Sequence, residues 1–509
     1  MATRYDAVVI GAGLGGLTAG ALAAREGQRV LVLECNATVG GAATIYRHGA
    51  LTIEASLHEI DGLDPDDPKI GLIRSLGLDR SLEFVDVPEM YEVRGGPVGA
   101  PFVLPSGPEA ALAAAKARFP DQAEALERFF AAMLAVRAGA SLAFRHQEDR
   151  GWWLTHLPQA AQALWPVIRH ARATLGDVLR HLFGADEAVK CALAATLGYY
   201  HDDPDGILFL NFALPTASYL VGGGHYIRGG SAALSGRLAD LVREAGGEVL
   251  TGHAAVAIEL DGDRVAAVRY RGKEGIESVA ATQCVFGNAA PAVLAGLLPA
   301  DQAMVFFARY EGRAPSVSLW TIVLGLARPA AELGVAHYST MFLPDWMTSL
   351  ADHAQSADVM AEPEGPRLPP FGLADYGRID SGLQQGAPYL VTLTGLDRIG
   401  NWERLGPRET RLRKDIWKER LVTFLEEIYP DFGKTVMQSE MSTAATLHHY
   451  LNTPGGAAYG FAPDQHAAGP RTAIEGLYLA SAWTMGGGFT GAMLGGAAAV
   501  REATREMRG

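Results

Sequence analysis

The sequence predicts an α/β protein, and three observations point to that class. Near the start, two short apolar runs, Ala7-Val8-Val9-Ile10 and Val30-Leu31-Val32-Leu33, enclose a glycine-rich turn and an alanine-rich segment. Strand patterns return at 248–252, 284–287 and 476–484, and the last of them leads into a second glycine-rich loop. Long stretches with other periodicities separate these pieces. The pattern is typical of a Rossmann-like domain that is discontinuous in the chain and carries insertions.

The first glycine-rich turn, Gly11-Ala12-Gly13-Leu14-Gly15-Gly16, has the form that binds a dinucleotide. Gly11 permits the tight turn, Gly13 lets the backbone approach a pyrophosphate, and Gly16 allows the helix to pack closely on the strand. The helix N-terminus offers free N–H groups and a partial positive charge to the phosphates. Glu34, at the end of the second strand, can accept hydrogen bonds from ribose hydroxyls. Strand, turn, helix, strand and acidic residue together predict a dinucleotide site.

Composition excludes several classes of protein. The chain has 509 residues, 49% hydrophobic and 20% charged, which is enough for two or three domains. The net charge is −14 and no long run of lysine and arginine occurs, so nucleic acid is not expected as a partner. The three cysteines are scattered, which indicates neither a disulfide framework nor a metal site, and we expect each to be a small buried side chain.

The sequence shows no signal peptide and no apolar stretch of about 18 residues that would span a membrane. We therefore expect a cytoplasmic protein, either soluble or peripheral on the inner membrane face.

The segment after Glu34 contains small residues that suit a loop passing close to a ligand, Gly40-Gly41-Ala42-Ala43-Thr44. His58 is the most notable titratable residue that follows, although an ordinary core or surface histidine is the simpler interpretation. An acidic cluster, Asp61 to Asp67, is typical of a surface loop and ends the first piece of the Rossmann-like domain, 1–68.

The stretch 69–220 predicts a helical subdomain. It holds a strand pair around Phe84 to Val103, and then Pro108 to Ala140 and Trp152 to Phe183 have helical spacing with wide apolar faces. Core packing explains most of these side chains. The density of Trp, Leu and Phe also suits the wall of an apolar substrate channel or a membrane-docking face.

The chain then returns to the Rossmann-like domain over 221–295, with a helix at Ser231 to Gly246 and a hairpin turn at Asp261-Gly262-Asp263. A second insertion, 296–469, combines alternating strand patterns with a charged helix, Arg408 to Tyr429, and predicts an α+β substrate-binding domain.

The final piece of the Rossmann-like domain, 470–509, is again strand, glycine-rich loop and helix. It lacks a second dinucleotide fingerprint, so we interpret its loop as touching the far end of the same ligand.

These motifs, in this order, resemble the two-dinucleotide-binding-domain flavoproteins and, more narrowly, the phytoene desaturase, carotenoid isomerase and retinol saturase group. The resemblance covers nearly the whole chain. It rests on Gly11 to Gly16 with Glu34, on Gly40-Gly41, on Gly229-Gly230, on Val256, and on Asn288-Ala289-Ala290-Pro291. The segment Asn452 to Gly460, followed by Gly476 to Gly496, looks most like the saturase branch.

The resemblance implies FAD as the cofactor, with the adenosine ribose on Glu34, the adenine on the backbone of Val256, and the flavin end on the C-terminal loop. The implied cofactor contacts are Gly11, Gly13, Leu14, Gly15, Gly16, Glu34, Cys35, Gly40, Gly41, Ala42, Val256, Asn288, Ala289, Ser481, Ala482, Trp483, Thr484, Thr490, Gly491, Ala492 and Met493. Because no second fingerprint follows, a tightly bound NAD(P)H is not expected.

The chain departs from the pattern of its relatives at three places. Ala42 stands where many relatives have Arg, Ser481-Ala482 where many flavoproteins have Gly-Asp, and Ala290 where the group has Asp. Each change removes a polar contact, so a loosely held FAD is one expected outcome.

Adding or removing hydrogen across a carbon–carbon bond needs hydride transfer and usually one proton transfer. The candidate proton donors or bases are His58, Glu59, His448 and Tyr459, and none lies in a motif that fixes its role.

Three hypotheses follow. The first is a desaturase, saturase or isomerase of an isoprenoid, carotenoid, retinoid or other hydrophobic lipid. The second is an amine- or amino-acid-oxidase-like enzyme with an aromatic cage, to which only Trp483, Phe489 and Tyr459 could contribute. The third is a non-catalytic prenyl or lipid carrier, against which the intact glycine fingerprint argues.

Overall fold

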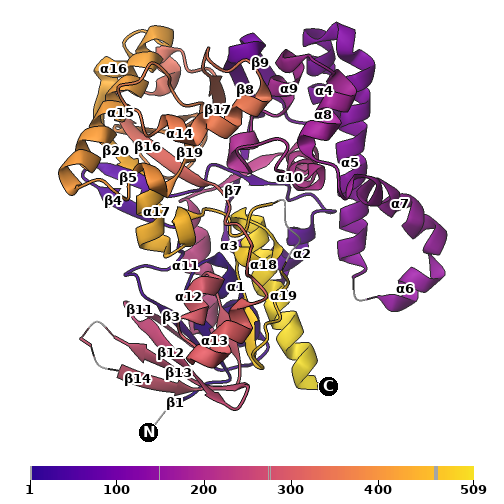
Figure 1. Cartoon of the computed structure of the whole chain (residues 1–509), viewed down its shortest axis with the longest axis vertical. Helices are drawn as coiled ribbons and strands as arrows, with labels where there is room; N and C mark the ends of the chain where they lie inside the picture. Colours follow the sequence, from indigo (N-terminus) through magenta and orange to yellow (C-terminus); the bar gives the residue numbers. More distant parts are fainter. Residues whose placement is uncertain (1–2, 148, 273, 276, 464–467, 509) are drawn as a thin grey trace.

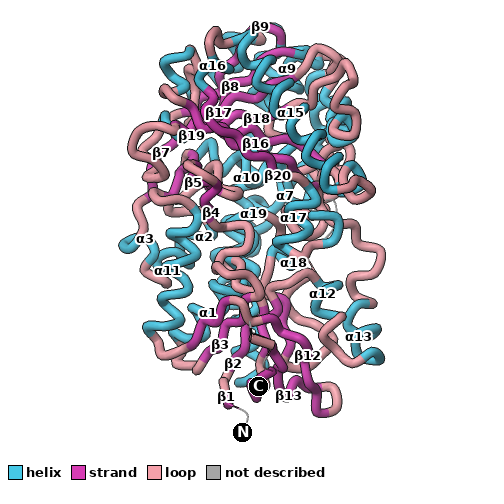
Figure 2. The backbone as a smooth tube through the Cα atoms, turned by 90° about the vertical axis from the view of Figure 1, so that its left-hand side faces the viewer, coloured by secondary structure: helices cyan, strands magenta, loops and turns pink. Residues whose placement is uncertain are grey.

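The computed structural model describes residues 3–147, 149–272, 274–275, 277–463 and 468–508. Figure 1 shows the N-terminal strands and the last helix in the lower part of the molecule, a large sheet at the upper left, and a helical region at the upper right. Seen from the side, two sheets lie at opposite ends with helices between them (Figure 2). The predicted α/β class is confirmed.

The lower sheet is five-stranded and wholly parallel, with the strand order β11-β3-β2-β15-β21. Its strands are β2 (Ala7–Ile10), β3 (Val30–Glu34), β11 (Glu248–Thr251), β15 (Val285–Gly287) and β21 (Leu477–Leu479). The strands come from three separate pieces of the chain, and the order reverses between β2 and β15. A reversal of this kind leaves a crevice at the carboxyl ends of the two strands, where α/β proteins bind their ligands.

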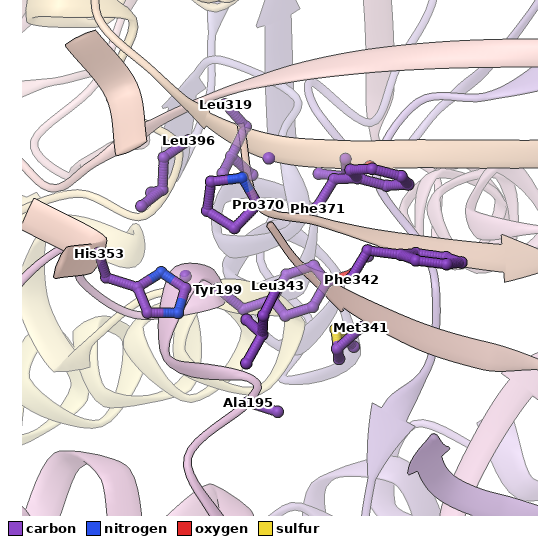
Figure 3. A pocket seen from close by; sticks show the side chains of 14 residues that line it. Ala195, Tyr199, Leu319, Met341, Phe342, Leu343, His353, Pro370, Phe371 and Leu396 are labelled. Carbon is purple, nitrogen blue, oxygen red and sulfur yellow. The ribbon is translucent and has the colours of Figure 1, made fainter. Parts of the chain in front are cut away.

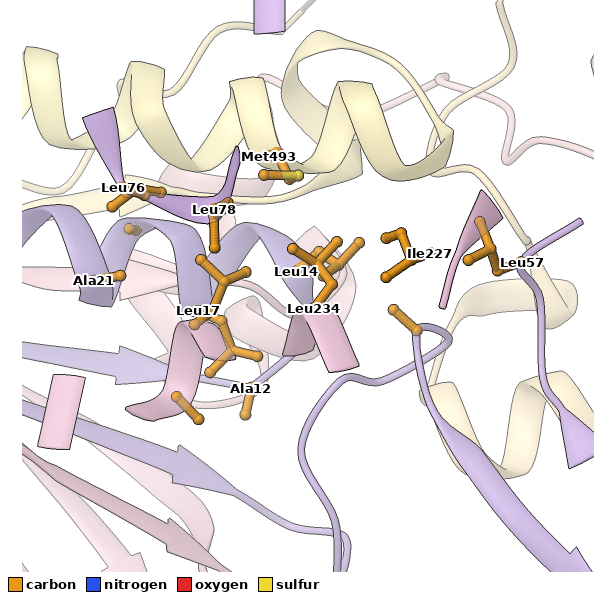
Figure 4. Close-up of a cluster of buried hydrophobic side chains, with 14 of the residues drawn as sticks. Ala12, Leu14, Leu17, Ala21, Leu57, Leu76, Leu78, Ile227, Leu234 and Met493 are labelled. Carbon is orange, nitrogen blue, oxygen red and sulfur yellow. The ribbon is translucent and has the colours of Figure 1, made fainter. Parts of the chain in front are cut away.

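Helices α1 (Leu14–Arg25), α11 (Ser231–Glu244) and α19 (Gly488–Arg508) cover this sheet. Leu14 and Leu17 of α1 pack in one buried cluster with Leu234 of α11 and Met493 of α19 (Figure 4). Each such side chain contributes about 1.5–3 kcal/mol when fully buried. The first turn of α1, which follows the glycine fingerprint, is therefore held on two sides.

Beside this domain lies a four-stranded sheet, in the order β1-β14-β13-β12. Its strands are β1 (Thr3–Arg4), β12 (Ala254–Asp261), β13 (Arg264–Arg271) and β14 (Glu277–Ala281). The predicted hairpin turn is confirmed, because Asp261 pairs with Arg264 across Gly262, whose φ is +63°.

The upper sheet has seven strands in the order β20-β16-β19-β18-β17-β8-β9, and only the β17–β8 pair is parallel. Its strands are β8 (Glu89–Gly95), β9 (Gly99–Pro105), β16 (Ser318–Leu326), β17 (Ser339–Leu343), β18 (Phe371–Asp375), β19 (Tyr389–Asp397) and β20 (Val436–Ser442). The charged helix predicted at Arg408 to Tyr429 is α15 (Pro407–Ile428), which buries Trp417, Leu421 and Leu425.

The strand pair predicted around Phe84 to Val103 is in fact three strands in two sheets. β7 (Phe84–Val87) pairs with β10 (Gly224–Ile227), which also pairs with β6 (Ile60–Asp61), whereas β8 and β9 join the upper sheet. Alternating hydrophobicity shows that a segment is a strand but does not show which sheet it joins. The upper sheet therefore takes strands from both predicted insertions.

Most of the remaining 69–220 stretch is helical, as expected from its spacing. Its helices are α2 (Pro68–Ser75), α3 (Leu78–Ser81), α4 (Pro108–Arg118), α5 (Ala123–Arg145), α6 (Arg150–Thr155), α7 (Leu157–His170), α8 (Leu175–Phe183), α9 (Glu187–Leu193) and α10 (Phe209–Gly222). Helices α6 and α7 project from the side of the molecule (Figure 1). None of the helices among the described residues is long and apolar enough to cross a membrane.

Short elements complete the fold. They are β4 (Ile45–His48), β5 (Leu51–Glu54), α12 (Pro291–Ala295), α13 (Ala300–Phe307), α14 (Ser356–Val359), α16 (Phe432–Thr435), α17 (Ala444–Leu451) and α18 (Ala482–Met485). Cys191 and Cys284 are buried as expected, but the same expectation was wrong for Cys35, which is exposed because it follows the last residue of β3.

Candidate functional site

The crevice between the ends of β2 and β15 is built from glycine on one side and Asn288 on the other. Gly11 has a φ of +95°, a conformation that side chains other than glycine rarely adopt. A Cβ at Gly16 would lie 2.2 Å from the Gly11 carbonyl oxygen, and one at Gly13 would lie 2.5 Å from Nδ2 of Asn288. Larger residues at these positions would push α1 off the sheet or fill the crevice.

Helix α1 begins in this crevice without a side-chain cap on its N-terminus. Among its first N–H groups, that of Gly16 donates to Oδ1 of Asn288 at 3.0 Å, so Asn288 ties the helix to the end of β15. The uncapped first turn is a binding site of the kind that anions use, because its N–H groups and its dipole both favour negative charge.

Glu34 lies next to this turn and is 4% exposed. Its carboxylate accepts hydrogen bonds from the N–H groups of Ala12 and Asn36, each at 2.8 Å, and the Cys35 thiol lies 3.4 Å from Oε1. A carboxylate has about four lone-pair positions, so with these three donors about one remains for a hydroxyl group of a ribose. The backbone thus fixes the orientation of the carboxylate before any ligand binds.

Val256 lies where β12 departs from regular pairing with β13, at a bulge between Ala255 and Ala257. The N–H of His253 donates to the Glu34 carbonyl at 2.8 Å, which holds the start of β12 beside the end of β3. The bulge leaves Val256 out of register with β13, and the start of its strand lies beside the end of β3, so the adenine contact stays a prediction.

Gly40 and Gly41 continue the crevice. The Gly40 N–H donates to the Ala12 carbonyl at 2.7 Å, and both glycines have positive φ values, +114° and +60°. Ala42 follows, and its carbonyl accepts a hydrogen bond from the Ser56 hydroxyl at 2.8 Å. This loop passes directly against the first glycine-rich turn.

The C-terminal loop closes the crevice from the other side. A Cβ at Gly15 would lie 2.3 Å from the Ala480 carbonyl oxygen, and one at Gly496 would lie 2.2 Å from the Gly15 carbonyl oxygen. Ser481 caps α18, and Thr490 donates to Oδ1 of Asp61 at 3.0 Å. The glycines at both ends of the chain therefore allow the same close contact.

Together these features fit an extended dinucleotide: a carboxylate for the ribose, an uncapped helix for the phosphates, and two loops without bulky side chains along its length. The predicted contacts Leu14, Ala289, Ala482, Thr484, Gly491 and Ala492 lie on these same turns and helix starts.

Beyond the C-terminal loop lies a group of buried proton-carrying side chains, in the segment between β5 and β6. His58 is partly buried, with Nδ1 3.1 Å from the Tyr199 hydroxyl and Nε2 3.4 Å from Oγ1 of Thr394. The Tyr338 hydroxyl donates to the His58 carbonyl. Desolvation lowers the pKa of His58 to about 4, so its ring is neutral at pH 7.

The pKa of Glu59 shifts in the opposite direction, upward. Its Oε2 is buried and has no hydrogen-bond partner among the described residues. Burial, and then the negative charges of Asp61 and Glu89, raise the pKa of Glu59 to about 8. The group is therefore a neutral carboxylic acid at pH 7, which is the form that donates a proton.

The other two predicted proton carriers lie in different places. Tyr459 lies near Tyr199. Burial raises the pKa of Tyr199 most, and the charges of Tyr459 and Glu59 raise it further. His448 is exposed at the end of α17, with Nδ1 2.8 Å from the Thr453 carbonyl oxygen. The structure thus brings His58, Glu59 and Tyr459 into one region and does not bring His448 to it.

Sequence reasoning missed Tyr199, Thr394 and Tyr338. They come from the turn Leu197–Tyr199, from β19 and from the segment before β17. The pair Tyr199-Tyr200 followed by His201-Asp202-Asp203 is the one local signal that could have drawn attention to this region. These segments are far apart in the chain, and the fold brings their three side chains to His58.

Trp483 and Phe489 do not form an aromatic cage. The Trp483 ring packs edge-on against Phe461, with ring centroids 4.8 Å apart, in the core beside the four-stranded sheet. Phe489 packs against a different core cluster, the one that covers the parallel sheet. An aromatic cage that encloses an amine needs rings that face one space, which these two rings do not do.

Comparison with known proteins agrees with this arrangement. Residues 9–70 match the family described as NAD(P)-binding Rossmann-like domain. The all-trans-retinol 13,14-reductase of Homo sapiens is 27% identical over 274 residues, which are 51% of this chain and 43% of that protein. The chain thus spans less than half of the length of that relative. The all-trans-retinol 13,14-reductase of Danio rerio is 24% identical over 533 residues, which cover 96% of this chain and 84% of that protein.

Among solved structures, an oxidoreductase from Methanosarcina mazei superposes with a TM-score of 0.62 at 18% identity, over 98% of this chain and 100% of that one. Cyclohexylamine oxidase from Brevibacterium oxydans IH-35A gives a TM-score of 0.57 at 17% identity, over 99% and 100%. A putrescine oxidase variant gives 0.63 at 14% identity, again over 99% and 100%. These structures share the fold. By its sequence the chain is similar to the retinol 13,14-reductases, and it shares its fold with these solved oxidase structures.

Proposed function

We propose that the protein is an FAD-dependent oxidoreductase that saturates, desaturates or isomerises carbon–carbon bonds of a hydrophobic, retinoid-like substrate. The observation that carries the proposal is Glu59, whose Oε2 is buried without a partner among the described residues, beyond the end of a dinucleotide crevice. The names of the relatives support it, because retinol 13,14-reductases act on a polyene alcohol.

FAD would lie along the crevice, and it would supply the hydride chemistry. Its ribose would bind Glu34, its pyrophosphate the start of α1, and its flavin end the loops 481–484 and 490–493. Ala42 and Ser481-Ala482 offer no charged group to the phosphates or the ribityl chain. Affinity would therefore rest on backbone N–H groups and on shape, which supports a weakly held cofactor.

Glu59 would donate the proton that a carbon–carbon saturation requires, or hold it during an isomerisation. His58 has a different role in this proposal. Its neutral ring contacts Tyr199 and Thr394 at its two nitrogens, so it orients the Tyr199 hydroxyl toward the same space. Burial and the negative charges of Asp61 and Glu89 raise the pKa of the Glu59 carboxyl and so favour its neutral form.

The amine-oxidase hypothesis is supported only by the shared fold of the solved amine oxidases. The separate packing of Trp483 and Phe489 favours an apolar substrate over an amine.

The same proposal includes peripheral contact with a lipid surface through α6 and α7. Leu154, Leu157, Trp165 and Ile168 on these helices are 75%, 60%, 61% and 60% exposed. No acidic residue occurs from Arg150 to His170, although the whole chain carries a net charge of −14. An exposed apolar face without negative charge is suited to a membrane surface.

A direct test is anaerobic incubation of the FAD-loaded protein, in separate samples, with all-trans-retinol, carotenoids, fatty acids and amines. Bleaching of the flavin absorbance identifies a substrate that is oxidised, and chemically reduced enzyme tests the reverse direction through reoxidation. We expect a response to the polyene class. A response to amines alone would overturn the proposal, and a protein that cannot be loaded with FAD would overturn both enzyme hypotheses.

A further inference from the structure

Tyrosine hydroxyl groups hold the segment that contains His58 and Glu59. Three successive carbonyl groups of this segment each accept a hydrogen bond from one tyrosine: Leu57 from Tyr376 at 2.8 Å, His58 from Tyr338, and Glu59 from Tyr219 at 3.3 Å. A fourth hydroxyl, that of Tyr199, contacts the His58 ring. Because these four hydroxyl groups are already bound, they fix the position of Glu59 before a substrate enters.

Two further tyrosines of the same region have hydroxyl groups that are not used in this way. Among the described residues, neither the Tyr200 hydroxyl nor the Tyr459 hydroxyl has a hydrogen-bond partner, and Oε2 of Glu59 has none either. All three side chains keep partial exposure, so they border a space that a ligand can enter. Unmet donors at such a place indicate a ligand that carries an acceptor.

Tyr200 and Tyr459 reach this space from different elements. Tyr200 follows the turn Leu197–Tyr199, and its ring packs edge-on against Phe212 of α10, with ring centroids 5.9 Å apart. Tyr459 lies against the C-terminal loop, because a Cβ at Gly487 would lie 2.2 Å from the Cβ of Tyr459. One hydroxyl is thus supplied by the helical region and the other from beside the expected flavin end.

These groups are in their protonated forms at pH 7. Burial, and then the charges of Asp61, Glu59 and Tyr459, raise the pKa of Tyr200 well above its ordinary value, and burial raises that of Tyr459. Such charge effects act over short distances, so they also indicate that Tyr200, Tyr459 and Glu59 are neighbours. Two phenol groups and one carboxylic acid therefore act as neutral hydrogen-bond donors in one place.

The acidic neighbours of this group are bound to other side chains. Oδ1 of Asp61 lies 3.3 Å from the Lys69 ammonium group and accepts a hydrogen bond from the Thr490 hydroxyl at 3.0 Å. Oε1 of Glu89 lies 3.2 Å from Nδ1 of His337. Negative charge that develops on a ligand would thus be stabilised by the neutral donors, beside carboxylates that already have partners.

The pocket between the upper sheet and the turn Leu197–Tyr199 does not compete for the substrate (Figure 3). Its volume is about 30 Å³, which is room for about two water molecules. Tyr199 forms part of its wall, whereas Tyr200 and Tyr459 do not. A substrate therefore meets the proton-carrying group on the side of Tyr200 and Tyr459.

Neutral carboxyl groups and tyrosine hydroxyls together are an established form of oxyanion hole. Such a site stabilises an enolate, which forms when a hydride adds to a carbon–carbon double bond that is conjugated to a carbonyl group. An isolated double bond, or one beside an alcohol, has no oxygen that can take the electron pair. The free donors thus distinguish among the classes of polyene that the protein could reduce.

We propose that Tyr200 and Tyr459 form an oxyanion site for the carbonyl oxygen of an α,β-unsaturated aldehyde or ketone, and that this class is the preferred substrate. A hydride from the reduced cofactor bonds to the β-carbon, and the electron pair of the double bond moves to the carbonyl oxygen. The enolate then takes the Glu59 proton at the α-carbon, which restores the carbonyl group, and the Glu59 carboxylate regains a proton from water. The proposal rests on the proposed function and narrows its substrate class.

The first test measures binding to oxidised, FAD-loaded protein and needs no turnover. The probe is β-ionone, a conjugated isoprenoid ketone, and the measured quantity is the infrared stretching frequency of its carbonyl group. Hydrogen bonds to the oxygen lower this frequency, so we expect a shift to lower frequency on binding. Tyr200→Phe and Tyr459→Phe should each reverse part of the shift, and the double variant should abolish it.

The second test measures the anaerobic reoxidation of chemically reduced protein by two matched pairs, β-ionone with β-ionol and all-trans-retinal with all-trans-retinol. We expect each carbonyl compound to react at least about 10²-fold faster than its alcohol, and each Tyr→Phe change to slow the carbonyl reaction by about 10²-fold, the usual effect of one oxyanion donor. Tyr270→Phe, at a partly exposed tyrosine on β13, should change neither measurement. Thermal unfolding of every variant shows whether the fold is intact.

An unshifted carbonyl frequency in the unaltered protein would overturn the proposal, as would a shift that survives both Tyr→Phe changes or a failure of the ketone to bind. Alcohols that reoxidise the protein as fast as the carbonyl compounds would overturn the substrate class and leave the proposed function standing. A tyrosine-dependent shift without reoxidation by any probe would overturn the proposed function and leave the carbonyl-binding site standing.

Discussion

The two ends of the site are built by different means. At the dinucleotide end, contacts are made by backbone atoms, and glycines allow them: Gly16 lies against Gly11, and Gly15 against Ala480. At the substrate end, contacts are made by side chains such as His58, Glu59 and Tyr199, and Oε2 of Glu59 has no partner among the described residues. The backbone therefore fixes the shape of the first end, whereas buried side chains set the chemistry of the second.

The largest effect of a substitution is expected at the dinucleotide end. In Gly16→Val, the Cβ would lie 2.2 Å from the Gly11 carbonyl oxygen, so α1 must move away from the sheet. We expect loss of FAD binding and a fall of about 3 kcal/mol or more in the free energy of unfolding. Flavin absorbance and chemical denaturation measure the two effects.

The matched control is Gly71→Ala, on α2. A Cβ at Gly71 meets nothing within 4 Å, so this change should raise stability by about 0.5–1 kcal/mol and leave FAD bound. Bound FAD in Gly16→Val would show that the steric argument is wrong.

Glu59→Gln tests proton donation at the substrate end. The amide cannot donate the proton, so we expect the rate of substrate saturation to fall by about 10²-fold or more while FAD remains bound. Stopped-flow flavin reoxidation measures that rate. Glu83→Gln, at an exposed carboxylate, is the control.

The pH dependence of that rate follows from the same group. The pKa of Glu59 is raised to about 8, so the proton is present below that pH and the rate should fall as pH rises through about 8. Because the folded pKa exceeds the unfolded value, the contribution of Glu59 to stability also decreases between about pH 4.5 and 8. A rate that stays constant from pH 6 to 9 would exclude Glu59 as the donor.

Glu34→Gln tests whether the Glu34 carboxylate binds the adenosine part of FAD. The amide nitrogen would face the N–H of Ala12 or Asn36, which both now donate to the carboxylate. We expect about tenfold weaker FAD binding and about 1–3 kcal/mol lower stability. Isothermal titration with FAD measures the affinity. An unchanged affinity would mean that the ribose lies elsewhere.

The smallest effect on stability is expected on the projecting helices. The double change Leu157→Ser and Trp165→Ser removes exposed apolar surface, so stability should change by no more than about 0.5 kcal/mol for each substitution. Flotation with vesicles that contain anionic lipid should fall to background. Met304→Ser with Met437→Ser, at exposed side chains on α13 and β20, is the control, and equal loss in both pairs would contradict a specific face.

The dinucleotide end was largely predictable from the sequence. The contact of Gly16 with Gly11 lies within one motif, and the backbone geometry of a strand–turn–helix unit is the same wherever it occurs. Even the distant C-terminal loop carried a signal, because glycines recur there. The strand pair near Phe84 was predicted less well, since alternation of residues does not choose between two sheets.

The substrate end was visible only in part. His58, Glu59 and Tyr459 could be named as titratable residues, but no spacing in the sequence tells a buried histidine from an exposed one, and His448 lies away from the others. Tyr199 and Thr394 carried no motif at all.

The sequence by itself thus determined the fold class and predicted the adenosine half of the cofactor site, because both depend on local backbone geometry that glycine and one acidic residue encode. Only the tertiary structure decided which side chains share the substrate end. Burial sets their charge states, and burial arises when the upper sheet, assembled from strands far apart in the chain, closes over the segment that holds His58 and Glu59.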